Sequence, residues 1–127
     1  MQYQKHFTVE EAQQILEKIR PQVEKIPLLK RQLDRLSYDP YHKRYTIAHP
    51  DSFKPYPREM EELVHIITEL HDHGVIVKGL DEGLIDFPHL RANGEEVHLC
   101  WKTGEPALKF WHTLKDGFAG RKPLSEI

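Results

Sequence analysis

The sequence has a single cysteine, no excess of either charge and no long apolar run. Cys100 has no second cysteine to pair with, so an internal disulfide is excluded, and a lone thiol suits a reducing compartment. A formal net charge of -2 offers no electrostatic basis for binding nucleic acid or an anionic membrane. No apolar run approaches the roughly 20 residues of a membrane span, and residues 1–7 lack an apolar signal region. We therefore predict a cytoplasmic protein with no nucleic-acid or membrane partner.

Three well-known catalytic motifs are also missing. The sequence has no GxSxG motif, no P-loop and no dinucleotide-binding glycine fingerprint. Serine hydrolases of that type, NTPases and Rossmann enzymes therefore have no support.

What remains is the composition of an ordinary globular domain. The 127 residues are 39% hydrophobic and 30% charged, which is typical of a folded chain and not of a disordered one. A chain of this length can bury a core without disulfides or metals to hold it together. We predict one domain over residues 1–127.

A long helix is predicted in residues 1–36. Thr8 and Glu11 have the spacing of a capping box, and apolar residues then recur every three or four positions from Val9 to about Leu36. Pro21 and Pro27 interrupt this pattern, and each removes a backbone donor. The pattern resumes after each proline, so we predict one bent helical segment. Whether the prolines kink this helix or divide it stays open.

A second helix is predicted in residues 58–74, from about Glu59 to His73, with Gly74 placed as the residue after its end. The first helix would be roughly 42 Å long and the second roughly 22 Å at about 1.5 Å per residue. The part of the first helix's apolar stripe that extends beyond the second helix must be buried by something else. Either the segment between the helices or a second copy of the chain could cover it, and we predict a homodimer.

The segment between the helices, residues 37–57, is rich in aromatic residues. It contains four prolines, five aromatic residues and the basic cluster His42-Lys43-Arg44. Aromatic rings normally need burial, which favours a wrapped loop that covers a helix face. A loop that grips a ligand or partner is the alternative. Nucleic-acid binding through the basic cluster is a third interpretation, which the net charge disfavours.

A small antiparallel sheet, a short helix and a tail are predicted in residues 75–127. The expected strands are Val75–Lys78, Leu84–Phe87 (halted by Pro88) and Glu95–Lys102. A short helix would open at Gly104-Glu105-Pro106 and end at Gly117. The predicted fold is α+β: a long kinked antiparallel helical hairpin packed with a three-stranded antiparallel sheet and a short C-terminal helix.

Several short motifs resemble one known family. They are FTVEEA at residues 7–12, Arg20-Pro21, GLIDFP at 83–88, VHLCWK at 97–102, Gly104-Glu105, Trp111-His112, GFAGR at 117–121 and Pro123-Leu124. Together they are similar to the signature of domain of unknown function 2203, a prokaryotic family. The resemblance covers nearly the whole chain except the aromatic segment. It implies a bacterial protein of that family, and it brings no activity and no site residues.

Four polar residues near the C-terminus are candidates for a ligand-binding cleft: Asp86, Glu105, His112 and Arg121. On the predicted third helix, Glu105 and His112 are two turns apart, roughly 10 Å, and could flank a small ligand. Asp86 lies in an apolar strand and needs a partner, for which Arg121 is one option. The structural alternatives are a helix-capping role for Glu105, a packed His112, and an ion pair between Asp86 and Arg121 that holds the tail.

A second candidate set could bind a metal. His98 and Cys100 point to the same face of one strand about 7 Å apart, and His112 could join them as a third N or S ligand for zinc or another transition metal. No CxxC or HExxH spacing supports such a site. Cys100 could also be a nucleophile with His98 or His112 as its base, although a lone cysteine in an apolar strand is more often a core residue.

The sequence therefore favours a non-catalytic ligand-binding or protein-interaction module. The alternative is a metal-dependent or cysteine-based enzyme that uses Cys100, His98 and His112. Whether the protein is an enzyme, and which ligand or cofactor it takes, are left open.

Overall fold

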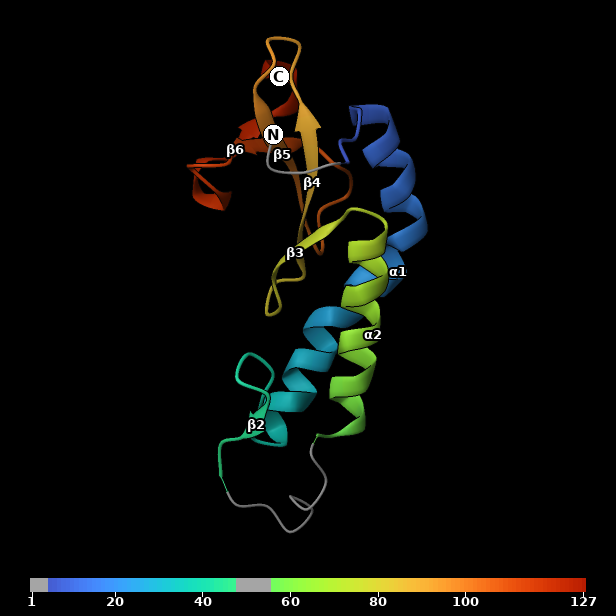
Figure 1. Ribbon diagram of the computed structural model, residues 1–127, viewed down its shortest axis with the longest axis vertical. Coiled ribbons are helices and arrows are strands. Elements are labelled where there is room, and N and C mark those ends of the chain that lie inside the picture. The colour runs from blue at the N-terminus through green and yellow to red at the C-terminus, as the bar shows by residue number, and fades with distance from the viewer. Residues whose placement is uncertain (1–4, 48–55) are drawn as a thin grey trace.

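The computed structural model describes residues 5–47 and 56–127. Its elements are α1 (Val9–Arg35), β1 (Tyr38–Asp39), β2 (Arg44–Tyr45), α2 (Arg58–Asp72), β3 (Ile76–Gly79), β4 (Leu84–Leu90), β5 (Glu96–Lys102), β6 (Phe110–Thr113), the 3₁₀ helix η1 (Phe118–Gly120), β7 (Lys122–Pro123) and the 3₁₀ helix η2 (Leu124–Glu126). The two α-helices lie side by side, and the main sheet packs near one end of the pair (Figure 1). The predicted α+β class is confirmed.

Helix α1 is a single helix of 27 residues that contains both prolines. Its capping box is formed as predicted: the Glu11 amide donates to Thr8 Oγ1 at 3.0 Å, and the Thr8 amide donates to Glu11 Oε1 at 2.8 Å. Pro21 and Pro27 therefore do not divide the helix. Figure 1 shows it curving along its length, as expected for a helix that lacks two backbone donors.

Helix α2 packs on α1 through an apolar stripe of one face. The buried residues of this stripe are Met60, Leu63, Ile66 and Leu70. Its predicted start and end are each within one residue of the observed ones, and Gly74 has the expected positive φ of 86° after the helix end. Of the helices in the described residues, neither is both long and apolar enough to cross a bilayer.

The aromatic segment begins with a two-stranded hairpin, β1–β2, that closes one end of the helical pair. The Tyr38 side chain is buried in the main core, and its ring meets that of Tyr45 edge-on at 5.1 Å. These two tyrosines pack against each other beside α1, whereas Tyr41 and Tyr56 are 62% and 44% exposed. Phe53, together with residues 48–55, lies outside the described residues.

The main sheet has five antiparallel strands in the order β3-β4-β5-β6-β7, so the prediction of three strands was wrong. Strand β4 also continues through Pro88 to Leu90, although Pro88 was expected to end it. The proline is tolerated because β3 pairs with β4 only from Leu84 to Asp86, so β3 does not need an amide donor from Pro88.

The predicted third helix does not form, and its residues fold into a turn followed by strand β6. Gly104 has a φ of 100°, which turns the chain back after β5. Phe110, Trp111 and Thr113 are aromatic or β-branched residues that favour strands, and Trp111 pairs with Leu99 of β5. The predicted tail then contributes β7, which pairs with β6.

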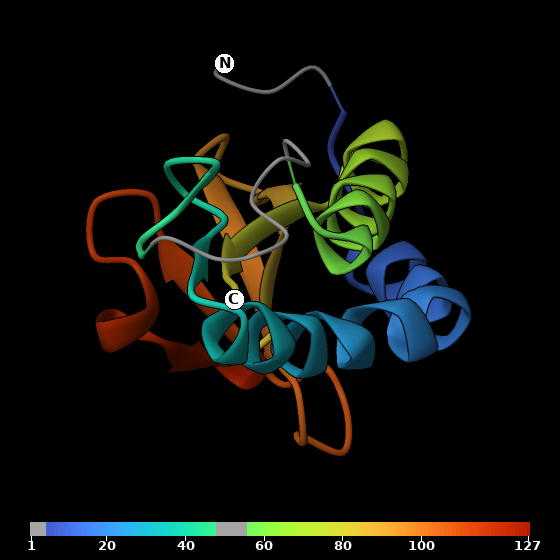
Figure 2. The same cartoon turned by 90° about the horizontal axis from the view of Figure 1, so that it is seen from below.

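The two faces of the sheet have different chemistry. Val97, Leu99 and Trp101 of β5 point into the core formed with α1 and α2, as the alternation predicted. The opposite face carries His98 and Cys100. Figure 2 shows both helices on one side of the sheet, so this second face is covered by neither of them.

Candidate functional site

A buried cluster of ionisable side chains lies on the outer face of the sheet. The register places Asp86 of β4 opposite Cys100 of β5, and His98 of β5 opposite His112 of β6. Because residues two apart on a strand share a face, all four side chains project to the same side. Each is at least 96% buried, with exposed fractions from 0% for Cys100 to 4% for His112.

Asp86 lies between two imidazoles. Its Oδ2 accepts hydrogen bonds from Nδ1 of His98 and from Nε2 of His112, both at 2.9 Å. The other ring nitrogen of His112, Nδ1, donates to the carbonyl oxygen of Thr113 at 2.8 Å. A carbonyl and an ionised carboxylate only accept hydrogen bonds, so His112 carries a proton on both nitrogens.

The pKa shifts agree with a buried ion pair. Burial alone would raise the pKa of Asp86, but the hydrogen bonds from His112 and His98 outweigh it and lower the pKa to about 2. Burial also opposes the charge of His112, yet the hydrogen bonds to Asp86 and to the Thr113 carbonyl raise its pKa above the ordinary value. Asp86 is therefore anionic and His112 cationic at mildly acidic pH.

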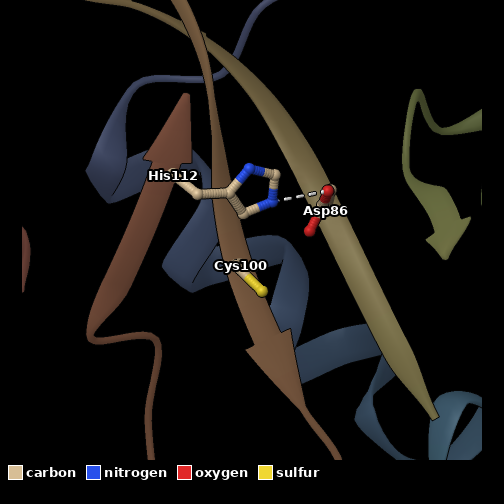
Figure 3. A group of neighbouring side chains, drawn as sticks. All are labelled: Asp86, Cys100 and His112. Carbon is tan, nitrogen blue, oxygen red and sulfur yellow. Dashed lines mark hydrogen bonds and ion pairs between the residues drawn. The ribbon is translucent and has the colours of Figure 1, made fainter. Parts of the chain in front are cut away.

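The second carboxylate oxygen of Asp86 is unusual. Oδ1 is buried and makes no hydrogen bond with any residue that the structure describes. One carboxylate oxygen, the Cys100 Sγ and one His112 ring nitrogen lie within 4.8 Å of one another, and the three side chains converge in Figure 3. Burial and the charge of Asp86 raise the pKa of Cys100, so its thiol stays protonated at neutral pH.

Three members of the cluster line the floor of a pocket of about 310 Å³, and Cys100 lies beneath them. Asp86, His98 and His112 line its polar part. The rest of the lining is Lys78 from β3, Leu84 from β4, and Leu114, Gly117 and Phe118 from the segment after β6. The pocket therefore combines a buried charged floor with a single lysine and an apolar rim.

Glu105 and Arg121 form an ion pair beside the cluster. Burial outweighs the influence of the nearby Arg121, which acts to lower the pKa of the Cys100 thiol. Arg121 Nη1 donates to both carboxylate oxygens of Glu105 at 3.0 Å, and Glu105 Oε1 also accepts from the Lys102 amide at 2.7 Å. The Arg121 guanidinium lies over the rings of Phe110 and Phe118, with its central carbon 4.2 and 4.3 Å from their centroids. These contacts hold the C-terminal segment against the turn after β5.

The four residues of the predicted cleft form two ion pairs. Asp86 and His112 come together in the pocket, while Glu105 and Arg121 pair with each other. The suggested ion pair between Asp86 and Arg121 does not form. Glu105 caps no helix, because no helix follows it, and its carboxylate instead caps the turn after β5.

The predicted metal-binding set is changed in one member. Cys100 and His112 belong to the converging group, but Asp86 takes the place of His98, which is hydrogen-bonded to Asp86 through Nδ1. From the sequence, Asp86 was predicted for the ligand cleft and not for the metal-binding set. The signal that could have joined the two sets was the register between β4 and β5, which places Asp86 opposite Cys100.

Comparison with known proteins gives one match. The model of the family described as "Uncharacterized conserved protein (DUF2203)" matches residues 5–124, which is nearly the whole chain. No curated protein and no solved structure matches the chain. The family resemblance of the strand motifs is therefore confirmed, and the chain belongs to the DUF2203 family.

Proposed function

We propose that this protein is a ligand-binding module whose site takes one divalent transition-metal ion through Asp86, Cys100 and His112. The observation that carries this proposal is Oδ1 of Asp86, a buried carboxylate oxygen with no hydrogen bond to any described residue, beside a thiol and an imidazole. An orphaned buried acceptor is costly, and a bound ion is one of its ordinary explanations.

The donor set suits zinc and similar ions. One oxygen, one sulfur and one nitrogen ligand match the chemistry of Zn²⁺ and Co²⁺ and not that of Mg²⁺ or Ca²⁺, which prefer oxygen alone. In a tetrahedral site with bonds of about 2.0–2.3 Å, ligand atoms are about 3.3–3.8 Å apart. The three atoms already lie within 4.8 Å of one another. Side-chain rotations that move the ligand atoms by about 1 Å would therefore close the site around an ion.

The charges also match a divalent ion. Without metal, the anionic Asp86 and cationic His112 balance, and the Cys100 thiol is neutral. Binding requires a thiolate and a neutral imidazole, so two protons leave when one divalent cation enters. The buried cluster stays neutral overall, which avoids the cost of placing a net charge away from water.

His98 would support the site without binding the ion. Its Nδ1 donates to Oδ2 of Asp86, which leaves Oδ1 for the metal. Ligating carboxylates are commonly held by such a hydrogen bond, which fixes their orientation. His98 is therefore a positioning residue in this proposal.

A cysteine-based enzyme has less support. The reactive form of cysteine is the thiolate, and burial together with Asp86 raises the pKa of Cys100 and disfavours that form. Cys100 is also fully buried, which keeps it from contacting a substrate in the metal-free protein.

The test is metal content and cobalt spectroscopy on protein purified without a histidine tag. We expect near-stoichiometric zinc or a related ion, and thiolate-to-cobalt charge-transfer absorption after exchange with Co²⁺. Cys100→Ser should abolish the charge-transfer band, and His112→Gln should weaken binding at least tenfold. The matched control is His65→Gln, which changes a histidine that is 71% exposed on α2 and should change neither result. A metal-free protein that binds no added Zn²⁺ or Co²⁺ would refute the proposal.

The homodimer, the cytoplasmic location and the lack of a nucleic-acid partner remain predictions from the sequence. A dimer interface over the helices would cover Leu28 on α1 and Val64 on α2, which are 51% and 46% exposed. Sedimentation at micromolar concentration is the measurement, and a clean monomer would contradict the dimer.

A further inference from the structure

Three protein ligands leave one position of a tetrahedral metal ion open, and two of the proposed ligands, Asp86 and His112, line the pocket. We infer that it is occupied by a small monocarboxylate whose carboxylate lies toward the metal and Lys78 and whose apolar end contacts Leu114 and Phe118. This inference rests on the proposed metal site and names the class of molecule that completes it.

The charge of the pocket favours a monoanion. The metal-loaded cluster of Asp86, Cys100 and His112 is neutral overall, so Lys78 is left as the remaining charge of the lining. Lys78 is exposed and forms no ion pair with the residues described in the structure. One carboxylate neutralises this lysine, whereas a phosphate dianion would leave an excess negative charge beside the buried Asp86.

The size of the pocket limits the ligand. A volume of about 310 Å³ is equivalent to roughly ten water molecules at about 30 Å³ each. That volume is at the small end for ligand pockets and suits a molecule of about ten non-hydrogen atoms or fewer. A short organic acid fits within this volume, whereas a nucleotide would extend beyond it.

The apolar rim favours an acid with an apolar end over a bare inorganic anion. Leu114 and Phe118 are 39% and 42% exposed, and both line the pocket together with the buried Leu84. A ligand group that covers these side chains removes apolar surface from water, at about 25 cal/mol per Å². Phe118 is also held in place, because the Arg121 guanidinium packs on its ring at 4.3 Å.

The experiment uses the full chain loaded with Co²⁺ and follows the cobalt d–d bands during titration with three probes. Benzoate has the carboxylate and an apolar ring, acetate has the carboxylate alone, and benzyl alcohol has the ring without the charge. We expect benzoate to shift the bands with a Kd at least tenfold below that of acetate. Benzyl alcohol should leave the bands unchanged.

Two variants test the assigned contacts. Lys78→Gln should raise the Kd for benzoate about tenfold and leave the cobalt spectrum of the ligand-free protein unchanged. The matched control is Lys18→Gln, an exposed lysine on α1, which should not affect the Kd. Phe118→Ala should reduce the preference for benzoate over acetate without changing cobalt binding.

The outcomes separate this inference from the metal site on which it rests. Absence of thiolate-to-cobalt absorption would refute the metal site itself. A normal cobalt spectrum that benzoate does not perturb would overturn the carboxylate inference and leave the metal site standing. An equal response to benzoate, chloride and phosphate would also overturn it, because the site would then accept any anion.

Discussion

His112 Nε2 lies 2.9 Å from Oδ2 of Asp86 in a part of the sheet where both side chains are buried. The opposite nitrogen of the same ring donates to the Thr113 carbonyl, so His112 is held by two acceptors at once. This buried ion pair organises the pocket on the outer face of the sheet.

Replacing Asp86 by Asn should strongly destabilise the fold. The substitution keeps the shape but removes the carboxylate, which leaves His112 without its counter-charge in a buried position. Breaking one member of a buried pair costs about 3–5 kcal/mol. Urea unfolding of the metal-free proteins would measure the change in the free energy of unfolding. Asp72→Asn, at the exposed end of α2, is the control and should change stability by less than about 0.5 kcal/mol.

The stability of the metal-free protein should depend on pH through the same pair. The pKa of Asp86 falls from 3.8 to about 2 on folding, so its stabilisation is present above about pH 4 and is lost as the pH falls toward 2. The pKa of His112 rises above 6.5, so its stabilisation is present below that pH and is lost as the pH rises through the raised value. The contribution of the pair is therefore greatest between about pH 4 and 6.5.

Urea unfolding across this pH range would test the prediction. In Asp86→Asn, the free energy of unfolding should change less with pH, both below about pH 4 and above about pH 6.5. Identical pH profiles for the two proteins would show that other groups control the stability.

Binding of one divalent metal ion should release two protons at mildly acidic pH. One comes from the Cys100 thiol and one from the His112 imidazolium, because both must lose a proton before they bind an ion. Affinity for Zn²⁺ should therefore rise about a hundredfold per pH unit below the pKa of His112, and about tenfold per unit above it. Calorimetric titration in two buffers with different ionisation enthalpies would count the protons.

Cys100→Ala supplies the internal comparison for proton release. This variant should bind Zn²⁺ more weakly and release one proton fewer than the parent protein. The same proton count in both proteins would mean that Cys100 does not bind the ion as a thiolate.

The pair of Glu105 and Arg121 should contribute to the stability of the fold. Both side chains are mostly buried, and one guanidinium nitrogen contacts both carboxylate oxygens at 3.0 Å. Arg121→Met should lower the free energy of unfolding by about 1–3 kcal/mol. Arg121→Lys should restore little, because an ammonium group does not stack as a planar guanidinium does on Phe110 and Phe118. An unchanged free energy of unfolding in Arg121→Met would contradict this role.

Local patterns in the sequence were enough to predict where the two α-helices begin and end. The capping box at Thr8 and the three-to-four spacing predicted α1 to within one residue at its end, since both depend on neighbours along the chain. The prolines left the continuity of α1 open, because packing against α2 and the sheet decides whether a helix with missing donors stays intact.

The sequence did not predict strands β6 and β7. Leu108, Trp111 and Leu114 are spaced like a helix stripe, while the neighbouring aromatic and β-branched residues favour a strand. Both patterns fit the same short segment. The edge of β5 decides between them, because it offers backbone partners to Phe110–Thr113 that an isolated segment lacks.

The sequence by itself determined the residue types of the candidate site and part of its geometry. Strand alternation placed His98 and Cys100 on one face, away from Val97, Leu99 and Trp101, and the structure agrees. Only the tertiary structure decided that Asp86 faces Cys100 and binds His112, while Arg121 pairs with Glu105. The contacts of Asp86 depend on the register of β4, β5 and β6, and register is set by the whole sheet and its core.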